Sequence, residues 1–159
     1  MAAMDLPVNP DYPYYLSESD LMELSGHWQA PEPTEWERFL GYAEQGHIAA
    51  GGTLIRQFDT DRALYLLTSG TLEVWVAEHS GGPVATIEPY AVLGEQSFLE
   101  PGPRSATVIA KTDAILHRLT PGAFDLLRVE APAMACALLF DIARTLSRRA
   151  RTRDGRTNA

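Results

Sequence analysis

The sequence has one cysteine and no long apolar stretch. Because Cys136 is the single cysteine among 159 residues, it cannot form an internal disulfide, and nothing argues for an oxidising compartment. The longest apolar run, from Ala131 to Phe140, is too short to span a bilayer and contains a proline. The N-terminus has no basic start followed by an apolar stretch, so no secretory signal is predicted. We therefore expect a soluble, cytoplasmic protein without a membrane partner.

Positive charge is scarce over most of the chain. Residues 1–143 carry 7 of the 13 basic and 20 of the 21 acidic side chains, a net charge of −13. Residues 144–159 carry six arginines and one aspartate, a net charge of +5. Duplex binding relies on neutralising phosphates, so the acidic body is a poor general binder of nucleic acid. The length and the apolar fraction of 45% indicate one globular domain.

Signatures of catalysis are also missing from the sequence. No Gly-x-Ser-x-Gly, P-loop or His-Glu-x-x-His pattern occurs. The histidines and the cysteine are scattered without the spacing of metal ligands (His27, His47, His79, His117 and Cys136). We expect no enzyme activity, no catalytic residue, no metal and no cofactor.

The middle of the chain consists of short segments with strand character. They are rich in β-branched and aromatic residues and are separated by Gly, Asp, Ser and Pro turns, which is typical of an antiparallel sandwich or barrel. The clearest of them are Thr53–Arg56, Ala63–Thr68, Thr71–Val76, Val84–Ile87, Ala106–Ala110 and Ala114–Leu119.

Helix signals flank this middle section. Thr34 and Glu37 form a capping box at the start of one helix, which Gly46 is expected to end. Thr120-Pro121 opens a second helix, with Thr as the cap and Pro in the first turn. A third helix is predicted from Ala133 to Ala150. The prediction is therefore an α+β fold: an antiparallel β-roll (a jelly roll of about eight strands) flanked by an N-terminal helix and two C-terminal helices.

These elements divide the chain into three parts. We assign residues 1–33 to an N-terminal lead with a short helix, residues 34–150 to the folded domain, and residues 151–159 to a basic, frayed tail. An apolar stripe follows the helix at 133–150 and can either pair with a second copy of the chain, giving a homodimer, or pack on its own β-roll. The stripe consists of Ala135, Leu138, Leu139, Ile142 and Leu146.

The connection at residues 93–107 carries residue types suited to binding a nucleotide. Gly94 allows a close backbone approach, and Glu95 to Leu99 can form one helical turn whose free N–H groups attract an anion. Arg104 supplies a planar fork that matches a phosphate. Because Glu95 is an acceptor, it suits a sugar hydroxyl rather than a phosphate. The bland alternative is a Glu95–Arg104 salt bridge on a surface loop.

The same segment resembles the phosphate-binding cassette of the cyclic nucleotide-binding domain family. This family includes the sensor domains of the catabolite activator protein and of protein kinase A regulatory subunits. The family pattern Phe-Gly-Glu followed by Pro-Arg-(Ala/Ser/Thr)-Ala-Thr stands here as Leu93-Gly94-Glu95 and Pro103-Arg104-Ser105-Ala106-Thr107. The strand-turn-strand at Tyr65–Trp75 and the strand entry at Gly51–Ile55 extend the resemblance to about residues 34–150. The sequence departs from the commonest pattern at Gln96-Ser97, where Leu-Ala is usual, which leaves the nucleotide open.

The resemblance implies a role for each matching position. Glu95 would accept the ribose 2′-hydroxyl, and Arg104 would pair the cyclic phosphate. The other implied contacts are the donors Gly94, Ser97, Ser105 and Ala106, the neighbouring cassette residue Gln96, and Leu67, Leu72 and Val74 along the sugar and base.

The base of the nucleotide is the least determined part of this prediction. In the family the last helix lies over the pocket, and an ungapped match places Arg149 at the base. An arginine is a donor only and suits guanine or a pyrimidine carbonyl better than the amino edge of adenine. The bland interpretation is a solvated cation at the helix end. Cyclic AMP, cyclic GMP and a cyclic pyrimidine nucleotide all stay open.

The expected function is a sensor that transmits binding through movement of the C-terminal helices. A DNA reader of the catabolite-activator type would need on the order of 60 further residues, so none is expected in this chain. The alternatives are a truncated transcription regulator, or a family member that has lost its ligand and serves as an interaction module. By analogy alone, the chain can be the N-terminal part of a larger bacterial effector, as in antiphage defence proteins that join a cyclic-pyrimidine sensor to an enzyme.

Overall fold

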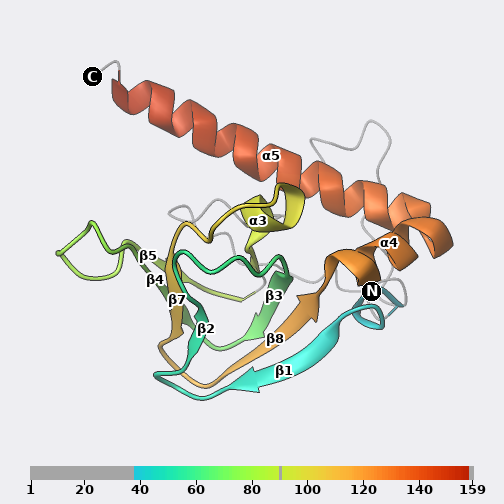
Figure 1. The fold of residues 1–159 in the computed structure, drawn as a ribbon, viewed down its shortest axis with the longest axis horizontal. Coiled ribbons are helices and arrows are strands. Elements are labelled where there is room, and N and C mark those ends of the chain that lie inside the picture. Colours follow the sequence, from blue (N-terminus) through green and yellow to red (C-terminus); the bar gives the residue numbers. More distant parts are fainter. Residues whose placement is uncertain (1–37, 90, 158–159) are drawn as a thin grey trace, which may run out of the picture.

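Two antiparallel sheets form a β-roll with helices along one side (Figure 1). The structure is a computed structural model that describes residues 38–89 and 91–157, except for the side chains of residues 145, 148, 149 and 152–157. One four-stranded sheet has the order β1-β8-β3-β6, and the other has the order β2-β7-β4-β5. The strands are β1 Glu44–Ile48, β2 Thr53–Ile55, β3 Leu64–Ser69, β4 Leu72–Trp75, β5 Ala85–Ile87, β6 Val92–Leu93, β7 Thr107–Ala110 and β8 Ala114–Leu119.

This arrangement confirms the predicted α+β roll, with each of the six predicted strands present to within two residues at either end. The sequence analysis missed β1 and β6. The first four residues of β1 are exposed, so the strand has no alternating apolar pattern, and β6 has only two residues. The prediction that Gly46 ends a helix was wrong, because Gly46 lies within β1 and pairs with Leu116 of β8. The helical residues 38–40 precede β1, and the predicted helix start at Thr34 lies outside the described residues, as does the N-terminal lead.

The two C-terminal helices begin within one residue of their predicted starts, and the second extends beyond its predicted end. α3 spans Glu95–Leu99, α4 spans Pro121–Glu130 and α5 spans Pro132–Thr157. The Thr120 hydroxyl accepts the backbone N–H of Ala123 at 3.1 Å, which confirms the predicted cap of α4. α5 continues through residues 151–157, where we expected fraying. Arginine has a high helix propensity and is favoured near a helix C-terminus, so a polar composition does not end this helix.

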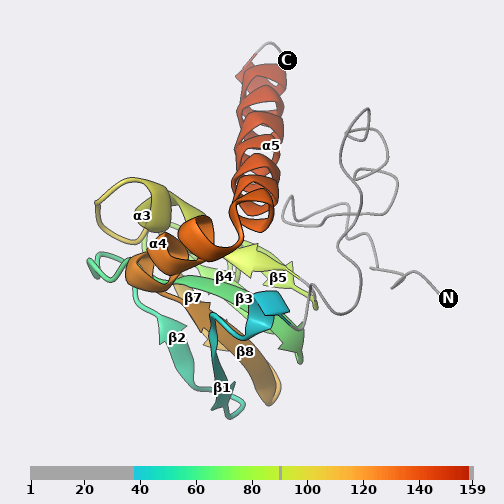
Figure 2. The same cartoon turned by 90° about the vertical axis from the view of Figure 1, so that its right-hand side faces the viewer.

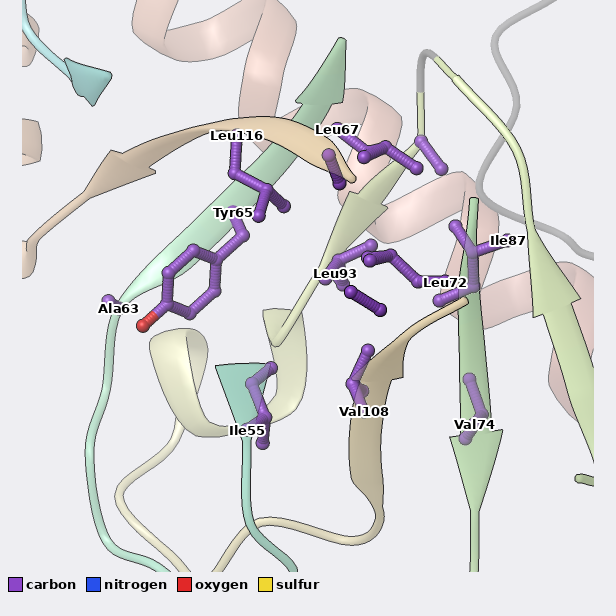
Figure 3. Packing of buried hydrophobic residues seen from close by; sticks show 13 residues of the cluster. Ile55, Ala63, Tyr65, Leu67, Leu72, Val74, Ile87, Leu93, Val108 and Leu116 are labelled. Atoms are coloured by element: carbon purple, nitrogen blue, oxygen red, sulfur yellow. The ribbon is translucent and has the colours of Figure 1, made fainter. Parts of the chain in front are cut away.

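Two apolar clusters hold the fold together, and β3 separates them. Alternate residues of a strand point to opposite faces, so Tyr65 and Leu67 enter the roll interior while Leu64 and Leu66 face the helices. Figure 3 shows the first cluster, the roll interior, with Ile55, Tyr65, Leu67, Leu72, Val74, Ile87, Leu93, Val108 and Leu116. The second cluster packs the β1-β8-β3-β6 sheet against α3, α4 and α5. Its buried members are Phe39, Leu64, Phe98, Leu119, Leu127, Ala135 and Ile142.

α5 crosses the second cluster and then extends away from the roll (Figures 1 and 2). Most of its predicted apolar stripe packs on its own domain: Ala135 and Ile142 are buried, and Leu138 and Leu146 are partly buried against the second cluster. Leu139 is 37% exposed and does not join them. Within the part of the chain that the structure describes, no helix combines the length and apolar character needed to cross a membrane.

Candidate functional site

Arg104 is the buried centre of the site. It precedes β7 and is only 3% exposed. Its backbone N–H donates to Asp59 O at 2.7 Å, and its carbonyl accepts from Phe58 N at 2.9 Å. These bonds attach Arg104 to the connection between β2 and β3. The side chain therefore starts from a fixed backbone position.

The guanidinium of Arg104 ties together two distant segments. Its Nη1 donates to Gly94 O at 3.1 Å, and its Nη2 donates to Ala63 O at 2.8 Å and to Asp61 Oδ2 at 2.5 Å. Partial burial raises the pKa of Asp61, but the hydrogen bond and charge of Arg104 outweigh it, and the pKa lies below its ordinary value. Arg118 Nη2 lies 3.8 Å from the other oxygen of Asp61. Asp61 is thus an ionised partner between two arginines.

One donor of this guanidinium has no partner among the described residues. The Nε atom of Arg104 is buried and makes no hydrogen bond there. A buried donor without an acceptor is costly, and such groups in folded proteins usually have a role. Nε and Nη2 form one edge of the guanidinium fork, the geometry that matches two oxygens of a phosphate. The missing acceptor is what an anionic ligand would supply.

Glu95 is the second buried charged residue of the site. It opens α3 and is 3% exposed. Burial raises its pKa to about 7, against the opposing effects of a bond from its own backbone N–H and of the charge of Arg104. A carboxylate that is expensive to keep ionised gains from a hydroxyl donor. This environment suits contact with a sugar hydroxyl.

Gly94 is required where α3 begins. Its φ of +82° lies in the left-handed region, and an added Cβ would stand 2.5 Å from Arg104 Nη1 and 2.9 Å from Ala63 O. The absence of a side chain therefore lets the α3 backbone meet the guanidinium.

We expect Gly94→Ala to lower the free energy of unfolding by roughly 2–3 kcal/mol, because it adds left-handed strain and a steric clash. Urea denaturation measures the loss. Gly51→Ala is the matched control: Gly51 has φ +84° and nothing within 4 Å of an added Cβ, so only the strain of about 1 kcal/mol applies. Equal losses in the two variants would contradict the clash.

The structure places the remaining predicted residues in three settings. Ser97 is buried and its hydroxyl donates to Gly102 O at 3.3 Å, while Gln96 and Ser105 are exposed and Ala106 packs against the first cluster. Leu67, Leu72 and Val74 are buried in the first cluster, which reaches the site through Ala63 and Leu93 (Figure 3). Arg149 falls within α5, and its side chain lies outside the described residues.

The sequence analysis missed the residues that hold Arg104 in place. Asp61 and Ala63 lie about 40 residues before Arg104, and the sequence analysis gave neither of them a part in the site: Ala63 was predicted only as the start of a strand, and Asp61 lies in the connection before it. An acidic residue beside a strand start is typical of any turn, so the sequence carries no signal for this pairing. Within the described residues, no group of three or more His, Cys, Asp or Glu side chains forms a candidate metal site.

Comparison with protein families gives a match that contains Arg104, Glu95 and the segment at residues 61–63, but not Arg149. The family model described as "Cyclic nucleotide-binding domain" matches residues 45–128, which is more than half of the chain.

Three curated relatives share about a third of the aligned residues. The cyclic AMP receptor protein of Thermus thermophilus is 34% identical over 96 residues, covering 58% of this chain and 43% of that protein. A cyclic-AMP-dependent protein kinase regulatory subunit of Dictyostelium discoideum is 35% identical over 72 residues, covering 44% and 22%. The Pycsar effector protein XpPycTIR of Xanthomonas perforans is 30% identical over 114 residues, covering 71% and 37%. The chain spans less than half the length of each relative.

Solved structures agree with these relatives. The catabolite activator protein of Thermus thermophilus aligns with a TM-score of 0.70 and 29% identity, covering 82% of this chain and 60% of that chain. The N-terminal domain of a transcriptional regulator from Streptomyces coelicolor aligns with a TM-score of 0.65 and 28% identity, covering 76% and 87%. The similarity in fold thus extends over most of this chain.

Proposed function

Since this chain belongs to the cyclic nucleotide-binding domain family, whose domains are regulatory or sensor units, we propose that it binds a cyclic mononucleotide and reports the binding through α4 and α5. The observation that carries the proposal is the buried Arg104 guanidinium with its unpartnered Nε. A buried cation with one free donor is prepared for a small anion.

The cyclic phosphate would bind the free edge of Arg104. A phosphate oxygen accepts from Nε, and a second oxygen shares or takes over Nη2, which now donates to Asp61 and Ala63 O. The body of the protein is strongly acidic, so this local cation and its fixed geometry are what make an anion site there. The family resemblance implies further donors to the phosphate, namely Gly94, Ser97, Ser105 and Ala106.

The ribose would lie against Glu95. A sugar hydroxyl donating to the buried carboxylate stabilises its ionised form, so ligand binding lowers the pKa of Glu95 from about 7. A phosphate beside the same carboxylate would be repelled. The two buried side chains therefore orient the nucleotide, with phosphate toward Arg104 and ribose toward Glu95.

The first step of transmission would be the contact between α3 and α4. The ring of Phe98 on α3 meets the ring of Phe124 on α4 edge-to-face, with centroids 5.4 Å apart and an interplanar angle of 88°. Phe98 is also buried in the second cluster with Leu127 of α4 and Ile142 of α5. Tightening of α3 around a ligand thus changes the surface on which both helices pack. A ligand drives this change only through its higher affinity for one arrangement.

Arg149 is our proposed base-contacting residue on α5. Because an arginine only donates, it favours guanine or a pyrimidine carbonyl over adenine. The similarity to a Pycsar effector protein supports keeping cyclic pyrimidine nucleotides, and a role as the sensor part of a longer antiviral effector, among the candidates. The similarity to cyclic AMP receptor proteins supports cyclic AMP.

Isothermal titration of the whole chain with cyclic AMP, cyclic GMP, cyclic CMP and cyclic UMP tests the function. We expect one of them to bind, and linear adenosine 5′-monophosphate to bind more weakly than any cyclic ligand that does. Absence of heat with all four would reject nucleotide binding. A preference for cyclic AMP that is unchanged in Arg149→Ala would reject the base assignment alone.

A second copy of the chain is the proposed partner of α5. The residues left exposed on α5 include Cys136, Leu139, Ala143 and Ala150, spaced by three, four and seven residues. This spacing follows the seam of a two-stranded coiled coil. We expect a dimer in sedimentation at micromolar concentration and a monomer for Leu139→Glu. An unchanged monomer in both would contradict the seam.

A further inference from the structure

Arg62 binds the C-terminal end of α3. Its Nε donates to Ser97 O at 3.1 Å and its Nη2 donates to Phe98 O at 3.0 Å. The last carbonyls of a helix have no partner within it, and the residue four positions after Ser97 is Pro101, which has no N–H to donate. The guanidinium of Arg62 supplies the missing donors, and a cation is favourable at this end of a helix.

The neighbours of Arg62 in the chain bind the other end of the site. Asp61 and the carbonyl of Ala63 both accept from Arg104, whose Nη1 donates to Gly94 O in front of α3. Three consecutive residues, 61–63, therefore hold the phosphate-binding arginine on one side and the end of α3 on the other. Through Arg104 and Arg62, both ends of α3 are attached to this one segment.

We propose that Arg62 is a positioning residue that couples the Asp61–Arg104 pair to α3 and α4. The inference rests on the proposed function for its ligand-dependent part. A phosphate that takes donors of Arg104 from Asp61 and Ala63 O shifts residues 61–63, and the two bonds of Arg62 carry the shift to the backbone of Ser97 and Phe98. The Phe98 side chain lies against Phe124, so α4 follows. Arg62 itself contacts no ligand in this scheme.

Hydrogen exchange on the ligand-free protein is the first test. Arg62→Gln removes the charge and the fork, and we expect amide exchange about tenfold faster over residues 95–100 and 121–130, since two bonds from a charged donor are lost. Arg56→Gln is the matched control, because Arg56 is an exposed arginine of the same connection. Faster exchange over 95–100 alone would reduce Arg62 to a cap of α3 and overturn the coupling, as would no change in either segment.

The second test uses whichever of cyclic AMP, cyclic GMP, cyclic CMP and cyclic UMP binds the wild type most tightly. We expect Arg62→Gln to keep its Kd within about threefold while the ligand-induced protection over residues 121–130 is lost. A large loss of affinity with protection intact would make Arg62 a ligand residue and overturn the proposal. Arg62→Lys keeps the charge but lacks the planar fork, so it should recover only part of the ligand-induced protection. This variant provides the test if Arg62→Gln does not fold. If no nucleotide binds the wild type, the proposed function fails, and the ligand-free exchange still decides the placement of α3.

Discussion

Arg104→Lys is expected to weaken cyclic nucleotide binding by at least about 100-fold. The guanidinium makes three hydrogen bonds in two directions, and its Nε has no partner among the described residues. A lysine ammonium is a point charge and cannot hold Gly94 O, Ala63 O and Asp61 while it also binds two phosphate oxygens. The loss of charge-assisted hydrogen bonds between the guanidinium and the phosphate costs about 3 kcal/mol of binding free energy, which corresponds to the roughly 100-fold weaker affinity. Isothermal titration measures the Kd.

Arg104→Ala is expected to destabilise the fold as well, by roughly 3 kcal/mol, because Gly94 O and Ala63 O lose the buried guanidinium that donates to them. Arg128→Lys is the control: Arg128 is an exposed arginine of α4 that pairs with Asp125 at 2.9 Å, and neither binding nor stability should change. An Arg104→Lys protein whose Kd stays within threefold of the wild type would rule Arg104 out as the phosphate ligand.

Glu95→Gln is expected to raise the free energy of unfolding at pH 8 by about 3 kcal/mol. Burial raises the pKa of Glu95 from 4.5 to about 7, so the folded state holds a proton that the unfolded state has released. The stabilising effect of the neutral carboxyl is complete below pH 4.5 and is lost as the pH rises through about 7. The glutamine variant has no such loss, so the two proteins should agree near pH 4 and diverge toward pH 8.

Asp141 needs a separate control in this experiment. Asp141 is a buried carboxyl on α5. Burial raises the pKa of Asp141 to about 7, against the opposing charge of Arg144. Its ionisation therefore destabilises the fold over a pH range similar to that of Glu95. Asp141→Asn should therefore stabilise the protein at pH 8 while leaving nucleotide affinity unchanged. Glu95→Gln should stabilise the protein and weaken binding. Urea denaturation at several pH values, with and without nucleotide, separates the two. Equal pH profiles of wild type and Glu95→Gln would refute the buried-carboxylate account.

The wild-type affinity should then depend on pH through Glu95. A hydroxyl donor prefers the ionised carboxylate, so binding should strengthen as the pH rises from 6 to 8, by up to about tenfold per unit below the pKa. Glu95→Gln should bind more weakly at every pH and show no such slope. A slope retained in the variant would assign the titration to another group.

Part of this site was predictable because its residues lie close together in the chain. The turn of α3 and the position of Arg104 follow from the order of Gly94, Glu95 and Arg104 within eleven residues. The cap at Thr120 follows from one hydroxyl and one proline, a local interaction. Residues 1–37, which include the predicted first helix start, lie outside the described residues and leave that prediction as it was.

Other parts were decided by contacts between distant segments. The charge of Asp61 meets Arg104 across 43 positions, and Arg62 meets Ser97 across 35, because β3 and the cassette are brought together by the roll. β1 has no apolar pattern of its own and forms because β8 offers it an edge. From the sequence, the apolar stripe of α5 could pack either on a second copy of the chain or on its own β-roll. The structure shows that Leu138 and Ile142 pack against the second cluster of their own domain.

The family, the strand-rich roll and the residue types at positions 93–107 can be recognised from the sequence, because propensities, caps and closely spaced motifs are local properties. The tertiary structure alone decided what holds Arg104, that Glu95 is buried enough to titrate near pH 7, and that three residues before β3 bind both Arg104 and α3. Burial and long-range pairing depend on which segments the fold brings together, and a pattern of residue types along one chain does not contain that information.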